Sequence, residues 1–296
     1  MDRLTAGQRG MDWQLEHFDL ATFVRATLAE DLGEGLPGGG RDVTVESVIP
    51  PEARFAGEMR SRDPITVAGL PIAAAFFRAL DPEMDIEVLV ADGVQVPSGA
   101  VLMRMHGLAR AMLTAERSAL NTVQHLCGIA TMTRAYVTAM GTTGCTLLDT
   151  RKTIPGLRHL EKYATRQGGA QNHRMGLWDA AMIKDNHILV AGDVREAVRR
   201  AREAGVERII CEVDRIDQIG PALEAGANHL LLDNMDPATL REAVALVAGR
   251  VPTEASGGVT LETIGAIAAS GVDYVSVGRL TQSAPAADIG LDFTPL

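Results

Sequence analysis

The sequence from Arg208 to Asp233, RIICEVDRIDQIGPALEAGANHLLLD, decides the fold class of the chain. An apolar run at Arg208–Cys211 is followed by a helical pattern over Ile216–Ala225 and by a second apolar run at His229–Leu232. Gly226 comes directly after the helical pattern, where a residue in the left-handed conformation commonly ends a helix. This order predicts two parallel strands joined by a right-handed helical crossover.

The same alternation extends over most of the carboxyl-terminal two thirds of the chain, after a long helix expected at about Ala115–Met140. Further strands are predicted at Thr146–Leu148, Ala181–Ile183, Val251–Ala255 and Tyr274–Val277, and further helices at Asp193–Ala204, Pro237–Val247 and Leu261–Ala269. Gly205 and Gly271 follow two of these helices, as Gly226 follows the first. The pattern is typical of an α/β fold with a parallel sheet.

Charged residues, serine or glycine stand at the ends of the predicted strands. Four of them recur at spacings of 21, 23 and 22 residues, namely Glu212, Asp233, Ser256 and Gly278. The earlier strands are followed by Asp149, Arg151, Lys152 and Lys184. A single Asp in such a position is often only a helix N-cap. In an α/β barrel, however, all these positions face one mouth, where active sites are built, so the register predicts a shared site.

The segment Asp149–His187 is basic although the chain as a whole is acidic. The chain has 28 Lys and Arg against 38 Asp and Glu, a formal charge of −10. The segment has seven Lys and Arg and four Asp and Glu, so it carries +3 and the rest of the chain −13. Its cations are mixed with Gly168, Gly169, Asn172 and His173, unlike those of a solvated helix face. This composition favours a substrate with several carboxylate or phosphate oxygens.

The other strand ends each have two interpretations. Glu212 and Asp233 can hold magnesium together with substrate phosphates, or they can bind ribose hydroxyl groups. Ser256-Gly257-Gly258 and Gly278 can bring backbone N–H groups to a phosphate, with a helix N-terminus behind them, or form ordinary tight turns. The position of these glycines at the ends of successive predicted strands favours phosphate binding over ordinary tight turns. An anionic substrate, a magnesium-bound polyphosphate and a phosphorylated sugar together indicate phosphoribosyl transfer, in which carboxylates stabilise a cationic ribosyl carbon.

The overall composition excludes several classes of protein. A chain of 296 residues with 46% hydrophobic residues is typical of globular proteins, not of disordered or collagen-like ones. The acidic balance argues against a nucleic-acid partner. Met1–Gly10 lacks the apolar centre of a signal peptide, and no stretch offers the roughly 20 apolar residues of a membrane span, so no membrane association is expected. Cys127, Cys145 and Cys211 form no CxxC pair and are expected to be buried free thiols in a reducing cytoplasm.

The amino-terminal third has a different pattern, which predicts a small mixed α+β unit. A helix is expected over Asp19–Glu30 and a flexible loop over Gly33–Gly40. Strands are predicted at about Arg54–Met59, Asp85–Val90 and Ala100–Met105, with a covering helix at Pro71–Leu80. The sequence therefore predicts two domains, residues 1–113 and residues 114–296.

Five blocks of sequence resemble those of the quinolinate phosphoribosyltransferase family. The central block is DTRKTIPGLRHLEKYATRQGGAQNHRMGLWDAAMIKDNHI at Asp149–Ile188. The others are TAERSALNTVQHLCGIAT at 114–131, LLLDNM at 230–235, EASGGVTLETI at 254–264 and DYVSVGRLTQSAPAADI at 273–289. The resemblance runs from about Leu28 to the carboxyl terminus. It implies an N-terminal α/β sandwich domain followed by an incomplete parallel α/β barrel with fewer than eight strands.

The resemblance also implies a reaction. Quinolinate and phosphoribosyl pyrophosphate give nicotinate mononucleotide, pyrophosphate and carbon dioxide, in de novo NAD biosynthesis with magnesium. The pyridine nitrogen attacks the anomeric carbon as pyrophosphate leaves, and decarboxylation follows. The residues implied to be catalytic are Lys152, Lys184, Glu212 and Asp233.

Substrate contacts are implied residue by residue. Those expected to hold the quinolinate carboxylates and nearby phosphates are Arg151, His173, Arg174 and Lys184, with Lys152 on the phosphoribosyl side. Those expected to contact the ribose and its magnesium, directly or through the substrate, are Glu212 and Asp233. Those expected to cradle the 5′-phosphate are Ser256, Gly257, Gly258 and Gly278. Arg117 matches a family arginine that reaches the active site of a neighbouring subunit, so a homodimer or higher homo-oligomer is expected.

Three departures from the family pattern leave the site charges in place. Glu34–Gly40 is inserted before Asp42-Val43-Thr44, Asp214 stands where a second Glu is common, and Ala170 replaces a usual Gly. Alternatives are a relative acting on another pyridine or aromatic acid, such as the molybdenum-associated homologues, a phosphate-binding barrel isomerase or synthase without magnesium, and a binding module without activity. The Lys184–His187 run and the pair of Arg151 and Arg174 favour quinolinate.

Overall fold

The structure, a computed structural model, describes residues 14–296, so the expectation for Met1–Gly10 lies outside the described residues. The chain forms two compact units. The first combines residues 14–131 with residues 159–168 and 284–296, and the second combines residues 132–158 and 169–283. Helix α4 (Ala109–Met140) starts in the first unit and ends in the second.

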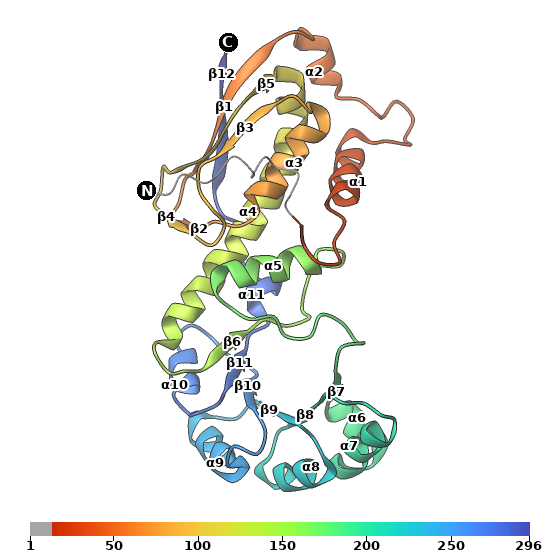
Figure 1. Cartoon of the computed structure of the whole chain (residues 1–296), viewed down its shortest axis with the longest axis vertical. Helices are drawn as coiled ribbons and strands as arrows, with labels where there is room; N and C mark the ends of the chain where they lie inside the picture. The colour runs from red at the N-terminus through yellow and green to blue at the C-terminus, as the bar shows by residue number, and fades with distance from the viewer. Residues whose placement is uncertain (1–13) are drawn as a thin grey trace. The chain divides into compact units, whose positions relative to one another are not determined.

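The first unit contains a four-stranded antiparallel sheet in the order β12-β1-β5-β3 (Figure 1). Its strands are β1 (Arg54–Ser61), β3 (Asp85–Val88), β5 (Val101–Leu108) and β12 (Ile289–Pro295), and β2 (Ile65–Thr66) pairs separately with β4 (Gln95–Val96). Met59, Met103 and Met105 are completely buried. They form the apolar face of this sheet, since alternate residues of a strand point to the same side.

Helices α1 (Leu20–Leu32), α2 (Val43–Val48), α3 (Leu70–Leu80) and α5 (Arg158–Gly168) complete the first unit. Asp19 caps α1 by accepting a hydrogen bond from the backbone N–H of Thr22 at 3.0 Å, and Gly33 ends it in the left-handed conformation. Phe76 and Phe77 of α3 are completely buried. A small sheet covered by helices therefore agrees with the predicted α/β unit.

The second unit is built on a parallel sheet of six strands in the order β6-β11-β10-β9-β8-β7 (Figure 1). They are β6 (Thr146–Leu148), β7 (Ala181–Ile183), β8 (Ile209–Val213), β9 (His229–Asp233), β10 (Thr253–Ser256) and β11 (Tyr274–Ser276). The first strand along the chain, β6, pairs with the last, β11, as in a barrel. The sheet does not close, because β6 and β7 are its two edges. This confirms an incomplete α/β barrel with fewer than eight strands.

Helices pack on the outside of this sheet, and the strand residues alternate between the two sides. The helices are α6 (Asp185–Ala191), α7 (Val194–Glu203), the 3-10 turn η1 (Ile216–Gln218), α8 (Ile219–Ala225), α9 (Pro237–Val247), α10 (Ile264–Ala268) and α11 (Arg279–Gln282). Ile209, Cys211 and Val213 belong to the main core of this unit, whereas Ile210 joins a separate small cluster with Leu231. The alternation therefore places Glu212 on the same side of β8 as Ile210.

One strand of the first unit, β12, was not predicted from the sequence. It pairs with β1, with Leu291 opposite Met59, and so residues 284–296 join the first unit. The predicted domain boundary at 113/114 lies within α4, and it stays a prediction about domains.

Cys127 and Cys211 are buried and Cys145 is half-buried, all three as free thiols. None of the helices described in residues 14–296 is long and apolar enough to cross a membrane.

Candidate active site

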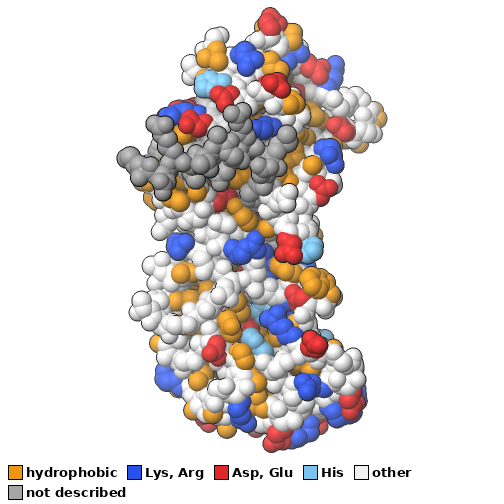
Figure 2. All heavy atoms as spheres, viewed as in Figure 1, with side chains coloured by type: hydrophobic (Ala, Val, Ile, Leu, Met, Phe, Trp, Pro, Cys, Tyr) orange, Lys and Arg blue, Asp and Glu red, His pale blue; other side chains and the backbone are white. Residues whose placement is uncertain are grey.

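A cavity of about 870 Å³ opens at the carboxyl ends of the strands of the second unit. Predicted site residues that line it are Arg151, Lys152, His173, Arg174, Lys184, Glu212, Asp233, Ser256, Gly257, Gly258 and Gly278. Figure 2 shows histidine and basic side chains gathered at a hollow in the lower part of the view, which is this unit. The strand register thus predicted which side chains share a cavity.

One predicted site residue does not line this cavity. Arg117 lies on α4 in the first unit, where it is exposed to solvent. Its expected role toward a neighbouring subunit stays a prediction. Arg279 and Gln282 of α11 line the cavity without having been predicted.

Two arginines provide the cationic wall of the cavity. Arg174 is half-buried, and its guanidinium donates a hydrogen bond to the backbone carbonyl of Ala180 at 3.0 Å. Burial lowers the pKa of this guanidinium, and the positive charge of Arg151 lowers it further. Two like charges held this close are well placed to receive a ligand with more than one anionic group, because such a ligand relieves their repulsion.

Lys184 and Glu212 form an ion pair at the ends of β7 and β8. The Lys184 side chain is 44% exposed, whereas the Glu212 side chain is only 12% exposed. The backbone N–H of Lys184 donates to Nδ1 of His187 at 2.9 Å, which fixes the start of α6. The ammonium therefore remains accessible to a ligand while its carboxylate partner is held in place.

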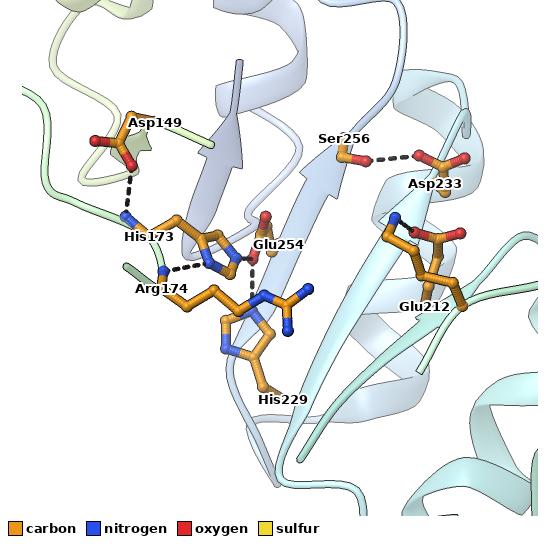
Figure 3. Close-up of polar contacts among 9 residues, drawn as sticks. Asp149, His173, Arg174, Glu212, His229, Asp233, Glu254 and Ser256 are labelled. Carbon is orange, nitrogen blue, oxygen red and sulfur yellow. Dashed lines mark hydrogen bonds and ion pairs between the residues drawn. The ribbon is translucent and has the colours of Figure 1, made fainter. Parts of the chain in front are cut away.

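Asp233 is held by two neighbours at the end of β9. Its carboxylate accepts a hydrogen bond from Oγ of Ser256 at 2.6 Å and another from the side-chain amide of Asn234 at 2.6 Å. Figure 3 shows Ser256 pointing at Asp233 from the adjacent strand. Gly257 has a φ of +90°, and a Cβ atom there would lie 2.1 Å from Oδ1 of Asn234. Glycine is thus required at 257 both by the backbone and by the close approach of Asn234.

Gly278 allows the stem of Lys152 to pass close to the backbone. A Cβ atom at Gly278 would lie 2.7 Å from Cδ of Lys152. Thr281 also holds this segment, because its hydroxyl donates to the backbone carbonyl of Lys152 at 2.7 Å. The helix expected from Leu261 begins at Ile264 and is only five residues long, so the glycine turns are the main backbone feature of this end of the cavity.

Two members of a buried polar cluster beneath the cavity, Glu254 and His229, were not predicted as site residues. Glu254 is completely buried, and its Oε2 lies 3.1 Å from Nε2 of His173 and 2.9 Å from Nε2 of His229 (Figure 3). Asp149, also completely buried, accepts the backbone N–H of His173 at 2.8 Å. Strand parity could have found Glu254, because it stands two residues before Ser256 and therefore on the same face of β10.

Two carboxylates, Glu212 and Asp233, are the residues expected to bind magnesium. Within residues 14–296, no group of three His, Cys, Asp or Glu side chains is placed to hold a metal ion. Glu212 and Asp233 nevertheless end neighbouring strands and line the same cavity. Mg²⁺ is commonly held by one or two carboxylates together with substrate phosphates and water, so the residues present fit a metal that arrives with its substrate.

Comparison with known proteins decides the family. Residues 42–127 match the quinolinate phosphoribosyl transferase N-terminal domain, and residues 129–292 match the C-terminal domain of the same family. The chain belongs to the quinolinate phosphoribosyl transferase family. Its two family domains meet within α4.

Relatives in the quinolinate phosphoribosyl transferase family are similar over almost the whole chain. Nicotinate-nucleotide pyrophosphorylase (carboxylating) of Mycobacterium leprae is 42% identical over 276 residues, covering 91% of this chain and 95% of that protein. The probable nicotinate-nucleotide pyrophosphorylase (carboxylating) of Bacillus subtilis is 39% identical and covers 95% of each chain. The crystal structure of NadC from Streptococcus pyogenes has a TM-score of 0.90 and 36% identity, covering 96% of this chain and 99% of that one.

Proposed function

We propose that the cavity of the second unit is the active site at which this chain transfers a phosphoribosyl group from phosphoribosyl pyrophosphate to quinolinate. The reaction releases pyrophosphate and carbon dioxide and gives nicotinate mononucleotide. The observation that carries the proposal is the convergence of Arg151, Arg174 and Lys184 with Glu212 and Asp233 on one cavity. Cations for two anionic substrates and carboxylates for a cationic ribosyl carbon are the groups that this chemistry requires.

The cations bind and orient the pyridine dicarboxylate. Arg151 and Arg174 stand together and form bidentate contacts with carboxylates, while the Lys184 ammonium provides a third positive charge. Held in this way, the pyridine nitrogen faces the anomeric carbon of the donor and forms the new C–N bond as the bond to pyrophosphate breaks. The contribution of the chain to this step is positioning and charge compensation, without a covalent intermediate.

The carboxylates act on the other substrate. Glu212 and Asp233 hold the ribose hydroxyl groups and the magnesium that arrives with the donor. When bound, magnesium neutralises charge on the departing pyrophosphate. Ser256, Gly257, Gly258 and Gly278 receive the 5′-phosphate, and Lys152 lies beside Gly278 to contribute a positive charge. Decarboxylation then leaves an electron pair on the ring carbon next to the quaternised nitrogen, and a proton takes the place of the lost carboxylate.

A second copy of the chain completes the proposal. Four large apolar side chains of the second unit are exposed by 74 to 86%, namely Leu177, Trp178, Leu189 and Val190. Leu177 is next to Trp178 and Leu189 is next to Val190 in the sequence, and adjacent exposed apolar side chains are typical of surfaces that bind another protein. We place the homodimer interface there, with Arg117 serving the active site of the partner subunit, and we place the enzyme in a reducing cytoplasm because its cysteines are free thiols.

The test is product release by the purified chain. Quinolinate labelled in its 2-carboxylate, phosphoribosyl pyrophosphate and MgCl₂ are expected to give carbon dioxide and pyrophosphate in equal amounts, and EDTA is expected to stop both. Lys184→Ala should lower kcat/KM about 100-fold or more, since it removes a charge that positions the substrate. Arg195→Ala, which removes an exposed cation of α7, is the matched control and should not change it.

Each alternative has its own outcome in this assay. Turnover of nicotinate but not quinolinate would identify a relative with a different pyridine acid as substrate. Activity that survives EDTA, without pyrophosphate release, would indicate a barrel isomerase or synthase. The absence of product from the unchanged chain and from Lys184→Ala alike, with either pyridine acid, would leave only a binding module.

A further inference from the structure

The buried carboxylate of Glu254 has no place in the reaction outlined above, although it lies at the floor of the cavity. It stands in the middle of β10, and the ring nitrogens of His173 and His229 approach the same carboxylate oxygen, Oε2 (Figure 3). An ionised carboxylate can only accept hydrogen bonds, so both of these Nε2 atoms carry protons.

Glu254 is ionised in this environment. Burial by itself raises the pKa of a carboxyl group, but the hydrogen bonds from His173 and His229 outweigh burial and hold the pKa of Glu254 below its ordinary value. A buried anion with two histidine donors is a costly arrangement, which is stable only when its partners are fixed. The cluster therefore holds the rings of His173 and His229 in fixed positions inside the barrel.

The other nitrogen of His173 is also used. Nδ1 of His173 lies 2.7 Å from the backbone N–H of Arg174 and accepts its hydrogen bond. A nitrogen that accepts a hydrogen bond carries no proton, so His173 is the neutral tautomer with its proton on Nε2. Both ring nitrogens are thereby bonded to the protein. While this arrangement lasts, the single N–H of His173 is donated to Glu254 and not to a substrate carboxylate.

We propose that Glu254 is a positioning residue for quinolinate binding: it fixes the Nε2–H tautomer of His173, and the ring of His173 in turn holds the backbone N–H of Arg174. The chain of contacts runs from β10 to the segment that carries the arginine. The contact with His173 fixes the backbone of Arg174, while the carbonyl of Ala180 holds its guanidinium at 3.0 Å, near the positive charge of Arg151. A ligand with two carboxylates then meets two guanidinium groups already in place.

This inference rests on the proposed function, and its test begins with the tautomer. In the ¹⁵N spectrum of the unchanged chain, the His173 signal, assigned by its loss in His173→Gln, is expected to show a neutral ring protonated at Nε2. A ring protonated at Nδ1, or at both nitrogens, would overturn the inference. This measurement needs no turnover, so it is separate from the failure of the proposed function, which the product assay reports.

Kinetics test the connection to Arg174. Glu254→Met keeps the size of the side chain but has no acceptor, and it should raise the KM for quinolinate about tenfold or more while the KM for phosphoribosyl pyrophosphate stays within about twofold. Glu254→Gln keeps an acceptor oxygen and should restore most of the quinolinate affinity. If Glu254→Met does not fold, Glu254→Gln is compared with His173→Leu instead. The KM for quinolinate is then expected to be lower in Glu254→Gln than in His173→Leu.

Thr253→Val is the matched control. Thr253 precedes Glu254 on β10, is buried, and donates its hydroxyl to Asp273 at 2.9 Å. Its replacement removes a buried hydrogen bond from the same strand without touching either histidine, so the KM for quinolinate should not change. Equal KM values for quinolinate in Glu254→Met and Thr253→Val, or an equal rise in the KM values of both substrates, would overturn the inference.

Discussion

A single side chain, that of Asn234, explains why residue 257 is glycine. Asn234 has a positive φ of 55°, and its side-chain amide donates a hydrogen bond to Asp233. Its backbone N–H donates to the carbonyl of Ser256 at 2.9 Å. Any side chain at 257 would collide with it. The carboxylate proposed to hold the ribose is thus positioned by a residue that a larger group at 257 would displace.

Gly257→Ala is therefore expected to raise the KM for phosphoribosyl pyrophosphate about tenfold, because displacement of Asn234 releases Asp233. The change also forces alanine into a positive φ, which costs about 1 kcal/mol of folding free energy. Gly249→Ala is the control: Gly249 has a φ of +70°, with no atom within 4 Å of the added Cβ. Steady-state kinetics and thermal unfolding of both variants separate the effects. Equal KM values would show that the collision is absorbed without moving Asp233.

At the level of strands and helices, the strand-end part of the cavity was predictable because its residues follow apolar runs. Glu212 and Asp233 each close such a run, and Gly278 follows another. Glu254 and His229 were not identified, because one lies inside a strand and the other begins one, where a polar residue interrupts the pattern by which a strand is recognised. Their partners are distant in sequence, and only the closure of the sheet brings them together.

The basic segment was predicted only in part for a similar reason. Arg151, Lys152, Arg174 and Lys184 line the cavity, but helix α5, which carries Lys162 and Arg166, belongs to the first unit. A count of charges along the chain cannot distinguish these positions, because a helix in the middle of the segment joins a different unit. Arg158 has a structural contact instead, since it donates to the backbone carbonyl of Met175 at 3.2 Å.

Strand β12 could have been found from its alternation of Ile289, Leu291 and Phe293. The ring of Phe293 stacks on that of Phe55 in β1, with 5.4 Å between the centroids. Phe293→Ala should lower the free energy of unfolding of the first unit by about 1–2 kcal/mol, since it removes half-buried apolar surface and a ring pair. Thr294→Ala, at the exposed next position, is the control. Urea unfolding followed by circular dichroism measures both, and coincident midpoints would rule out this role for the ring pair.

At the scale of the whole molecule, the division of charge agrees with an enzyme for two anionic substrates. The chain carries −10 overall, yet the cavity is lined by Arg151, Lys152, Arg174, Lys184 and Arg279 against three acidic residues. The cavity thus has an excess of cationic over acidic side chains, whereas the chain as a whole has an excess of acidic ones. Arg117 is the one predicted site cation outside this cavity, and its proposed role depends on a second subunit.

A mixed dimer tests that role directly. Arg117→Ala and Lys184→Ala are each expected to be inactive alone. If Arg117 serves the partner's site, a dimer with one chain of each kind has one site with both residues intact. A two-fold interface makes the exchange reciprocal, so equal amounts of the two variants, unfolded and refolded together, should recover about a quarter of the original activity. Lys184→Ala mixed with Asp233→Asn is the control, because both residues line the cavity of one chain. That mixture should stay inactive, and an equally inactive Arg117→Ala mixture would assign Arg117 to its own subunit.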